Sequence, residues 1–173
     1  MRNTFDRFNG RHQDYQAARP SYAQEFLDWL GELYAPPERY TAADIGSGTG
    51  KLSAQLLAAG FRVCGVEPNP DMRGAAEALL GGDPRFSSSN GTDHDTGLPD
   101  RSVDMVAAAQ AFHWFDGPAF ARECRRILRP GGRAVLVWNV RGSAPVNQAL
   151  AQVFREHCPS FHGFTGGMGE DDP

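Results

Sequence analysis

The chain has 173 residues, a formal net charge of −4 at pH 7, and 40% hydrophobic and 22% charged residues. These values are typical of a globular domain with one sizeable core, and the acidic balance argues against a general nucleic-acid binder. No apolar run reaches the length of a membrane span, and the polar N-terminus lacks the apolar core of a signal peptide. The three cysteines have no paired spacing, which excludes a disulfide framework and a zinc site, so we expect a cytoplasmic protein without a bound metal.

Predicted helices and strands alternate along the chain. Apolar residues spaced three and four apart predict a first helix over 21–34, with Ser21 as its N-cap and prolines after its end. Short apolar runs predict strands at 39–45, 61–67, 85–89, 102–110 and 133–139. Further helices are predicted at 50–60, 69–82, 117–132 and 144–158, with Gly60 as a stop and Asn69 as a cap. This alternation indicates a parallel α/β sheet with helices on both faces, whose ligands bind beyond the carboxyl ends of the strands.

A glycine-rich stretch, TAADIGSGTGK, begins in the first predicted strand and covers residues 41–51. It is not a P-loop, because Ile45 stands where the first glycine is needed and Leu52 where Ser or Thr is needed. It also departs from the dinucleotide fingerprint, because Lys51 occupies the place of the third glycine. What remains is an alternating glycine pattern behind an acid: Asp44, Gly46, Gly48 and Gly50. Such glycines let the chain turn sharply and let a ligand lie against the backbone.

This pattern resembles the first motif of class I S-adenosylmethionine (SAM)-dependent methyltransferases. Glu67 ends the second predicted strand, 17 residues after Gly50, and an acid near this spacing can accept hydrogen bonds from both ribose hydroxyls of an adenosine ligand. The alternative is a solvated charge at a strand end. The stretches AQAFHWFD and LRPGGRAVLVWN resemble the type-11 methyltransferase domain subgroup. The resemblance covers residues 14 to about 155 and implies a Rossmann-like sheet of about five parallel strands, with SAM as the cofactor.

The resemblance also implies which residues hold the cofactor. In the segment GTDHDTGLPD the adenine contact is expected at Thr92 and Asp93, and His94 and Asp95 are open alternatives to Asp93. Upstream, DYQAARPSY resembles a segment that closes over the methionine end of SAM. Its Tyr15 and Arg19 are either cofactor contacts or an aromatic packed under a loop and a surface arginine. The full predicted set is Asp44, Gly46, Ser47, Gly48, Gly50, Glu67, Pro68, Thr92, Asp93, Gln110, Tyr15 and Arg19.

Catalytic candidates are fewer. His113 is a candidate general base because its unperturbed pKa suits proton transfer near neutrality, but it lies in the run AFHWF, which is also compatible with a pocket wall. We expect Phe112 and Trp114 to be pocket walls or core. Asp104, at the start of the fourth predicted strand, is expected to hydrogen-bond backbone near the far end of the sheet.

The end of the chain departs from the family pattern. The resemblance implies two further strands, one of them antiparallel, whereas only PSFHGFTGGMGEDDP follows the last predicted helix. We therefore expect a single, C-terminally truncated domain over 1–173 with an unprotected sheet edge, weak SAM binding and a tendency to form homodimers. Its parts are an N-terminal cap segment and helix (1–35), a Rossmann-like core (36–158) and a flexible tail (159–173).

Three functions remain open from the sequence. The favoured one is methyl transfer from SAM to a small-molecule acceptor, with no nucleic-acid or membrane partner. The acceptor and the type of methylation are not identified by the sequence. The alternatives are a SAM-binding but catalytically incompetent module and an NAD- or nucleotide-binding Rossmann protein.

Overall fold

The computed structural model describes residues 21–139, 152–153 and 156. They belong to two compact units, one that ends at Val137 and one that begins at Trp138. The predicted cap segment with Tyr15 and Arg19, most of the last predicted helix and the predicted tail lie outside the described residues. In the second unit, Gln152 Nε2 donates a hydrogen bond to Glu156 Oε1 over 3.1 Å, and both residues are helical.

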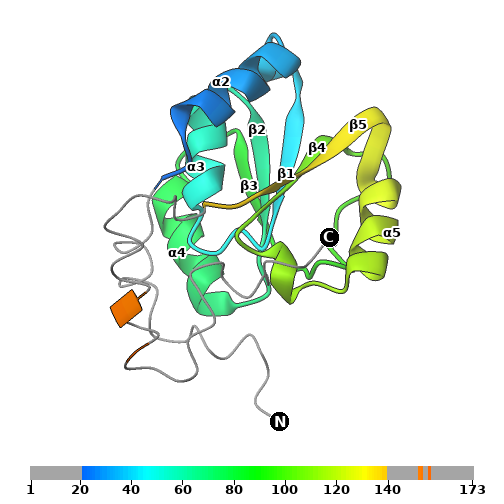
Figure 1. Cartoon of the computed structure of the whole chain (residues 1–173). Coiled ribbons are helices and arrows are strands. Elements are labelled where there is room, and N and C mark those ends of the chain that lie inside the picture. Colours follow the sequence, from blue (N-terminus) through cyan, green and yellow to red (C-terminus); the bar gives the residue numbers. More distant parts are fainter. Residues whose placement is uncertain (1–20, 140–151, 154–155, 157–173) are drawn as a thin grey trace. The chain divides into compact units, whose positions relative to one another are not determined.

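The first unit contains a five-stranded parallel sheet in the order β3-β2-β1-β4-β5, as drawn in Figure 1. Its strands are β1 (Thr41–Ile45), β2 (Arg62–Val66), β3 (Phe86–Ser89), β4 (Val103–Ala109) and β5 (Leu128–Val137). The predicted parallel sheet of five strands is therefore confirmed. The strand order reverses between β1 and β4, which is where open α/β sheets bind their ligands.

Helices cover both faces of this sheet (Figure 1). They are α2 (Gln24–Leu33), α3 (Lys51–Ala58), α4 (Pro70–Leu80) and α5 (Gly117–Ile127). One core joins α2 and α3 to one side of the sheet and includes Leu30, Leu56, Ala42, Val63 and Met105. The other joins α5 to the opposite side and includes Phe120, Ile127, Ala43, Val66 and Val106. Neighbouring residues of one strand thus serve different cores, as the alternation of side chains along a strand requires.

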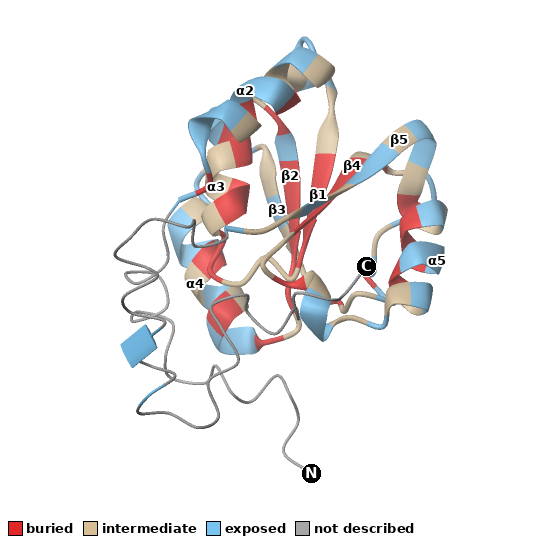
Figure 2. Cartoon of the chain, in the orientation of Figure 1, coloured by how far each residue is buried: buried red, intermediate tan, exposed pale blue. Residues whose placement is uncertain are grey.

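The central strands are buried and the last strand is not. Figure 2 shows buried residues running along β1, β2 and β4, whereas β5 is exposed or half-buried along its length. Parallel strands covered on both faces read as continuous apolar runs, which is why the sequence located the central strands well. Among the described residues β5 pairs only with β4. The predicted self-association through this edge stays a prediction.

Two local predictions about helix ends are confirmed. Asn69 caps α4, because its Oδ1 accepts hydrogen bonds from the backbone N–H groups of Asp71 and Met72 over 3.0 and 3.1 Å. Gly60 follows the end of α3 with a φ of 107°, a left-handed conformation that suits glycine.

Two other boundaries were predicted wrongly. The first helix begins at Gln24 after Ala23 rather than after Ser21, because the backbone of Tyr22 instead exchanges two 3.0 Å hydrogen bonds with the Gln55 side chain of α3. The helix expected over 117–132 ends at Ile127, and β5 begins directly after it. The reason is Pro130, which lacks an N–H group and disfavours a helical conformation in the residue before it.

The predicted role of Asp104 is confirmed. Its Oδ2 accepts a hydrogen bond from Thr41 N–H over 2.8 Å at the start of β1, and a second from the Arg129 guanidinium over 2.6 Å. It thereby ties the amino ends of β1 and β4 to β5, on the far side of the sheet from the strand carboxyl ends. Within the part of the chain that the structure describes, no helix is long and apolar enough to cross a membrane.

Candidate functional site

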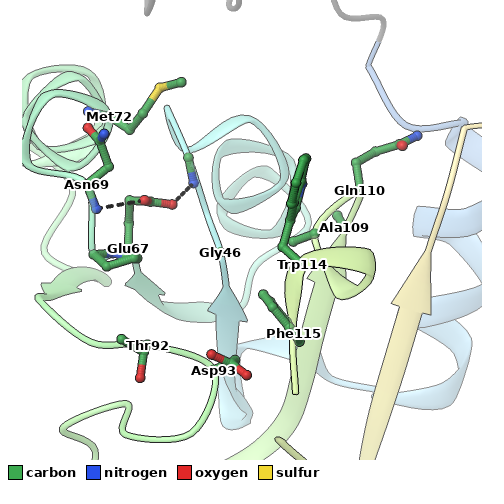
Figure 3. A pocket seen from close by; sticks show the side chains of 13 residues that line it. Gly46, Glu67, Asn69, Met72, Thr92, Asp93, Ala109, Gln110, Trp114 and Phe115 are labelled. Atoms are coloured by element: carbon green, nitrogen blue, oxygen red, sulfur yellow. Dashed lines mark hydrogen bonds between the residues drawn. The ribbon is translucent and has the colours of Figure 1, made fainter. Parts of the chain in front are cut away.

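A cavity of about 180 Å³ lies at the carboxyl ends of the strands, next to the switch in strand order. Its walls come from the loops that follow β1, β2, β3 and β4 and from the first turn of α4 (Figure 3). The lining residues are Gly46, Gly48, Glu67, Pro68, Asn69, Met72, Thr92, Asp93, Ala109, Gln110, Ala111, Trp114 and Phe115. Seven of the predicted cofactor contacts are therefore brought together around one cavity.

The glycine loop after β1 forms the floor between the two sides of the cavity. Gly46 has a φ of 71°, and a Cβ at this position would lie 2.8 Å from the Cβ of Ala111. The loop can therefore approach the segment after β4 this closely only with glycine at position 46. Gly50 has a different role. It precedes α3 with a φ of 81°, and a Cβ there would lie 2.9 Å from the Leu80 side chain of α4. Gly46 and Gly48 thus line the cavity, whereas Gly50 permits two helices to pack closely.

Glu67 is the buried carboxylate of the cavity. Its Oε2 accepts a hydrogen bond from Gly48 N–H and its Oε1 one from Asn69 N–H, both over 2.9 Å (Figure 3). The residue is only 8% exposed. Burial raises the pKa of Glu67 above its usual value, while the two N–H donors and the nearby Arg73 charge act in the opposite direction. An ionised carboxylate has about four acceptor positions, so each oxygen of Glu67 retains one that no backbone N–H group in these two bonds occupies.

Asp44 and Ser47 support the loop and do not line the cavity. Asp44 lies beneath it, 1% exposed, and accepts a hydrogen bond from Ser53 Oγ over 2.7 Å. Burial raises the pKa of this carboxyl to about 6, despite the Ser53 hydrogen bond. Ser47 is oriented toward β2, since a Cβ on Gly65 would lie 3.0 Å from its Oγ.

The loop after β3 brings Thr92 and Asp93 to the cavity. Asp93 Oδ2 accepts a hydrogen bond from Asp116 N–H over 3.0 Å, which ties this loop to the start of α5. Of the three residues left open as the adenine contact, only Asp93 lines the cavity, and His94 and Asp95 are exposed. Thr92 and Asp95 hydrogen-bond each other through two contacts, which closes the loop on itself. Contact with the adenine stays a prediction.

The segment after β4 forms the aromatic side. Gln110 has a φ of 55°, which is unusual for a residue with a side chain and turns the strand toward the cavity. Trp114 and Phe115 lie across the cavity from Glu67 (Figure 3). Trp114 is thus a wall residue. Phe112 instead packs in the core, with its ring centroid 5.7 Å from that of Phe120.

His113, the candidate base, is exposed and does not line the cavity. Its ring lies beside Trp114, with the two centroids 4.8 Å apart. This placement gives no support to proton transfer at the cavity by His113, because a base must reach the proton that it removes.

Several lining residues were not predicted. Asn69 and Met72 reach the cavity because α4 begins directly after Glu67, so the cap and the first turn lie at its wall. The predicted Asn-Pro helix start next to the acid was a usable signal for both. Ala109 and Ala111 flank Gln110, and Phe115 ends the run AFHWF, in which wall and core residues cannot be told apart from the sequence.

Comparisons with known proteins agree with this geometry. Residues 43–136 match the model of a protein family described as a methyltransferase domain. The chain belongs to this methyltransferase family. An uncharacterized methyltransferase of Mycobacterium tuberculosis strain H37Rv is 42% identical over 127 residues, which is 73% of this chain and 49% of that protein.

Solved structures give the same assignment. A putative type II methyltransferase from Anaeromyxobacter dehalogenans is 36% identical, with a TM-score of 0.62, over 80% of this chain and 56% of that one. A SAM-dependent methyltransferase from Aquifex aeolicus shares the fold at 19% identity, with a TM-score of 0.58, over 75% of this chain and 77% of that one. The fold is thus that of class I methyltransferases. This methyltransferase domain spans about half the length of the curated relatives that it matches.

Proposed function

We propose that this chain binds SAM in the cavity at the strand ends and transfers its methyl group to a small-molecule acceptor. The family supports methyl transfer in general. The cofactor, the acceptor class and the role of each residue are the parts that we add from the geometry.

The observation that carries the proposal is the state of the Glu67 carboxylate. Each of its oxygens already accepts one backbone N–H group, so the ionised carboxylate has one acceptor position left on each oxygen, and Glu67 lines the cavity. The two adjacent hydroxyls of a ribose are two donors side by side, which matches this pair of positions. The residues present therefore fit an adenosyl ligand, with its sugar at Glu67. The cavity loops with Gly48 and Asp93 flank this place from two sides.

The proposed methyl transfer requires mainly that side chains position the ligands. SAM, when bound, supplies a methyl group that its sulfonium has already activated. The chain's own residues would hold the sugar at Glu67, let the ligand lie against the Gly46–Gly48 backbone and keep water out with Trp114 and Phe115. Positioning of this kind is worth roughly 7–11 kcal/mol in well-oriented reactions. Since His113 lies off the cavity wall, we assign no general base.

Three related proposals concern the acceptor, the location and self-association. We propose a small molecule rather than a nucleic acid as the acceptor because the chain carries a net charge of −4. A cytoplasmic location is proposed from cysteine usage alone, and homodimer formation from the exposed β5 edge.

The second candidate function is a SAM-binding module without methyl-transfer activity. It is favoured by one observation, namely that His113, the candidate general base, is exposed and does not line the cavity. The NAD-binding alternative is disfavoured. Both the family match and the glycine spacing favour a methyltransferase over a dinucleotide-binding protein.

Calorimetry with SAM, its demethylated product and NAD tests the cofactor. We expect SAM and the product to bind and NAD not to bind, because the loop lacks the third fingerprint glycine. Binding of NAD without binding of SAM would refute the proposal. An assay with methyl-labelled SAM and a cell extract then separates an enzyme, which transfers label, from a binding module, which does not.

A further inference from the structure

Arg73 lies just behind the cavity wall, in the first turn of α4, and is not among the lining residues. Its Nη1 donates hydrogen bonds to the carbonyl oxygen of Glu67 over 2.8 Å and to Oδ1 of Asn90 over 3.1 Å. A longer contact of 3.4 Å reaches the carbonyl oxygen of Pro68. One guanidinium nitrogen therefore contacts both the loop after β2 and the loop after β3.

These two loops are the ones that carry the predicted ribose and adenine contacts. The β2–β3 ladder ends at the pair Val66 and Ser89, and one more backbone hydrogen bond joins Glu67 N–H to Ser89 over 3.1 Å. Beyond this point, Arg73 provides the next connection by joining Glu67 to Asn90. It replaces a ladder bond at the position where the strands separate to form the cavity.

Arg73 also acts on the charge of Glu67. The nearby charge of Arg73 on α4 lowers the pKa of this carboxyl, and the charge of Glu67 in turn raises the pKa of Asp44 in β1. Asp93 is the other acid at the cavity, on the loop after β3. The Glu67 carboxyl already accepts two backbone N–H groups, so it must be ionised to accept two hydroxyl donors as well. The guanidinium therefore favours the binding-competent form of Glu67.

We propose that Arg73 is a positioning residue for the cofactor: it holds the backbone at Glu67 and, through Asn90, the loop that carries Thr92 and Asp93 in one fixed arrangement, without touching the ligand. This inference rests on the proposed binding of SAM. It adds a residue outside the cavity on which that binding depends.

Calorimetric titration with SAM, on the whole chain, tests this with three variants. Arg73→Met keeps the length of the side chain but removes the donors and the charge, and we expect SAM affinity to fall about tenfold. Arg73→Lys retains a charge and should recover part of the loss. Glu77→Gln removes the 3.7 Å ion pair of Arg73 with its exposed neighbour on α4, and should bind SAM as the original chain does.

The pH profile of SAM affinity separates positioning from a merely structural role. A carboxyl with a raised pKa loses its charge as pH falls through that value, so affinity falls on the acid side. In Arg73→Met the pKa of Glu67 rises further, and the loss of affinity should begin at a higher pH. Burial raises the pKa of Asp44 as well, to about 6, but Arg73 is not among the groups that affect it. The difference between the two profiles therefore reports on Glu67.

The outcomes are distinguishable. If the original chain binds no SAM, the proposed function fails and this inference falls with it. If the original chain binds and Arg73→Met binds equally well with the same pH profile, only the inference is overturned. Should Arg73→Met not fold, Asn90→Ala decides, because it removes one exposed acceptor of the guanidinium. We expect it to weaken SAM binding severalfold, and unchanged affinity in this variant would overturn the inference.

Discussion

The two sides of the cavity are built in different ways. On the side of β2, the polar groups are held by backbone: Glu67 receives one N–H group on each oxygen, and the cap Asn69 receives two more on its side chain. On the side of β4, the wall consists of aromatic rings on a short turn, and Trp114 is 47% exposed. One side presents hydrogen-bonded polar side chains to the cavity, whereas the other presents an exposed apolar surface.

This difference indicates how the two ligands of a methyltransferase are divided over the site. Fixed acceptors that need no rearrangement suit a ligand that is always the same, because their order is set during folding. An exposed aromatic ring suits a ligand that differs from one family member to another, since it imposes little hydrogen-bond geometry. We therefore interpret the Glu67 side as the cofactor side and the Trp114 side as the one that faces the acceptor.

The largest effect is expected where the two sides meet. Gly46→Ala would place a Cβ 2.8 Å from Ala111 Cβ and 3.3 Å from the Phe115 ring, at a φ of 71°. The left-handed backbone costs about 1–2 kcal/mol and the overpacking about 1–3 kcal/mol more. We expect the free energy of unfolding in urea to fall by their sum. Gly74→Ala is the matched control, because nothing lies within 4 Å of its Cβ, and it should leave stability equal or higher. Equal stability of both variants would contradict the close approach of the two sides.

The next largest effect is expected on the cofactor side. Glu67→Gln replaces one acceptor oxygen by an NH₂ group, which cannot accept a ribose hydroxyl and faces a backbone N–H donor. We expect SAM binding to weaken by about 1.5–3 kcal/mol in calorimetry. Glu77→Gln, which changes an exposed acid on α4, should bind normally. An unchanged affinity in a folded Glu67→Gln variant would remove this residue from the site.

A smaller effect concerns the acid beneath the glycine loop. The pKa of Asp44 is about 6 in the folded chain against 3.8 for a free group, so the folded state binds more protons between these values. The contribution of protonated Asp44 to the free energy of unfolding is full below pH 3.8 and is lost as the pH rises through about 6. In Asp44→Asn this contribution is absent, so the stability difference between the two proteins should change by about 1–3 kcal/mol between pH 4 and pH 7. Parallel stability profiles in urea unfolding at these pH values would contradict the burial of this charge.

The smallest effect on SAM affinity is expected for a substitution on the aromatic side of the cavity. Trp114→Ala removes a half-exposed ring, so its SAM affinity should change by less than about 1 kcal/mol. The rate of label transfer from SAM to a cell extract should fall by a larger factor than the SAM affinity does. Trp29→Ala is the control, because this indole on α2 is exposed to a similar extent, 49%, and does not line the cavity, and both measurements should stay unchanged. A loss of SAM affinity in Trp114→Ala as large as in Glu67→Gln would show that the two sides are not divided in this way.

Much of the fold and part of the site were predictable from local patterns. The central strands are covered on both faces and so read as apolar runs, and the Asn-Pro start of α4 is a local cap signal. Glu67 was predicted from its spacing after the glycine loop, and the structure places it in the cavity lining, whereas its contact with a ribose stays a prediction. These signals are confined to a few neighbouring residues or to one βα unit.

The features that were not predictable depend on contacts between distant segments. Gly46 and Gly50 look equivalent in the sequence, and only Ala111 and Leu80 give them different roles. The start of the first helix was missed because Gln55 binds the backbone of Tyr22. Whether an aromatic residue after β4 is wall or core depends on how the 3₁₀ turn over Phe112–Trp114 is oriented, and periodicity does not encode this.

The most direct test of the account is a crystal structure of the chain with the demethylated product of SAM. We predict the ligand in the cavity between Glu67 and Trp114, with both ribose hydroxyls at hydrogen-bond distance from the Glu67 carboxylate. The backbone bonds from Gly48 and Asn69 to that carboxylate should be retained. A ligand bound elsewhere, or a Glu67 side chain turned away from the sugar, would contradict the account.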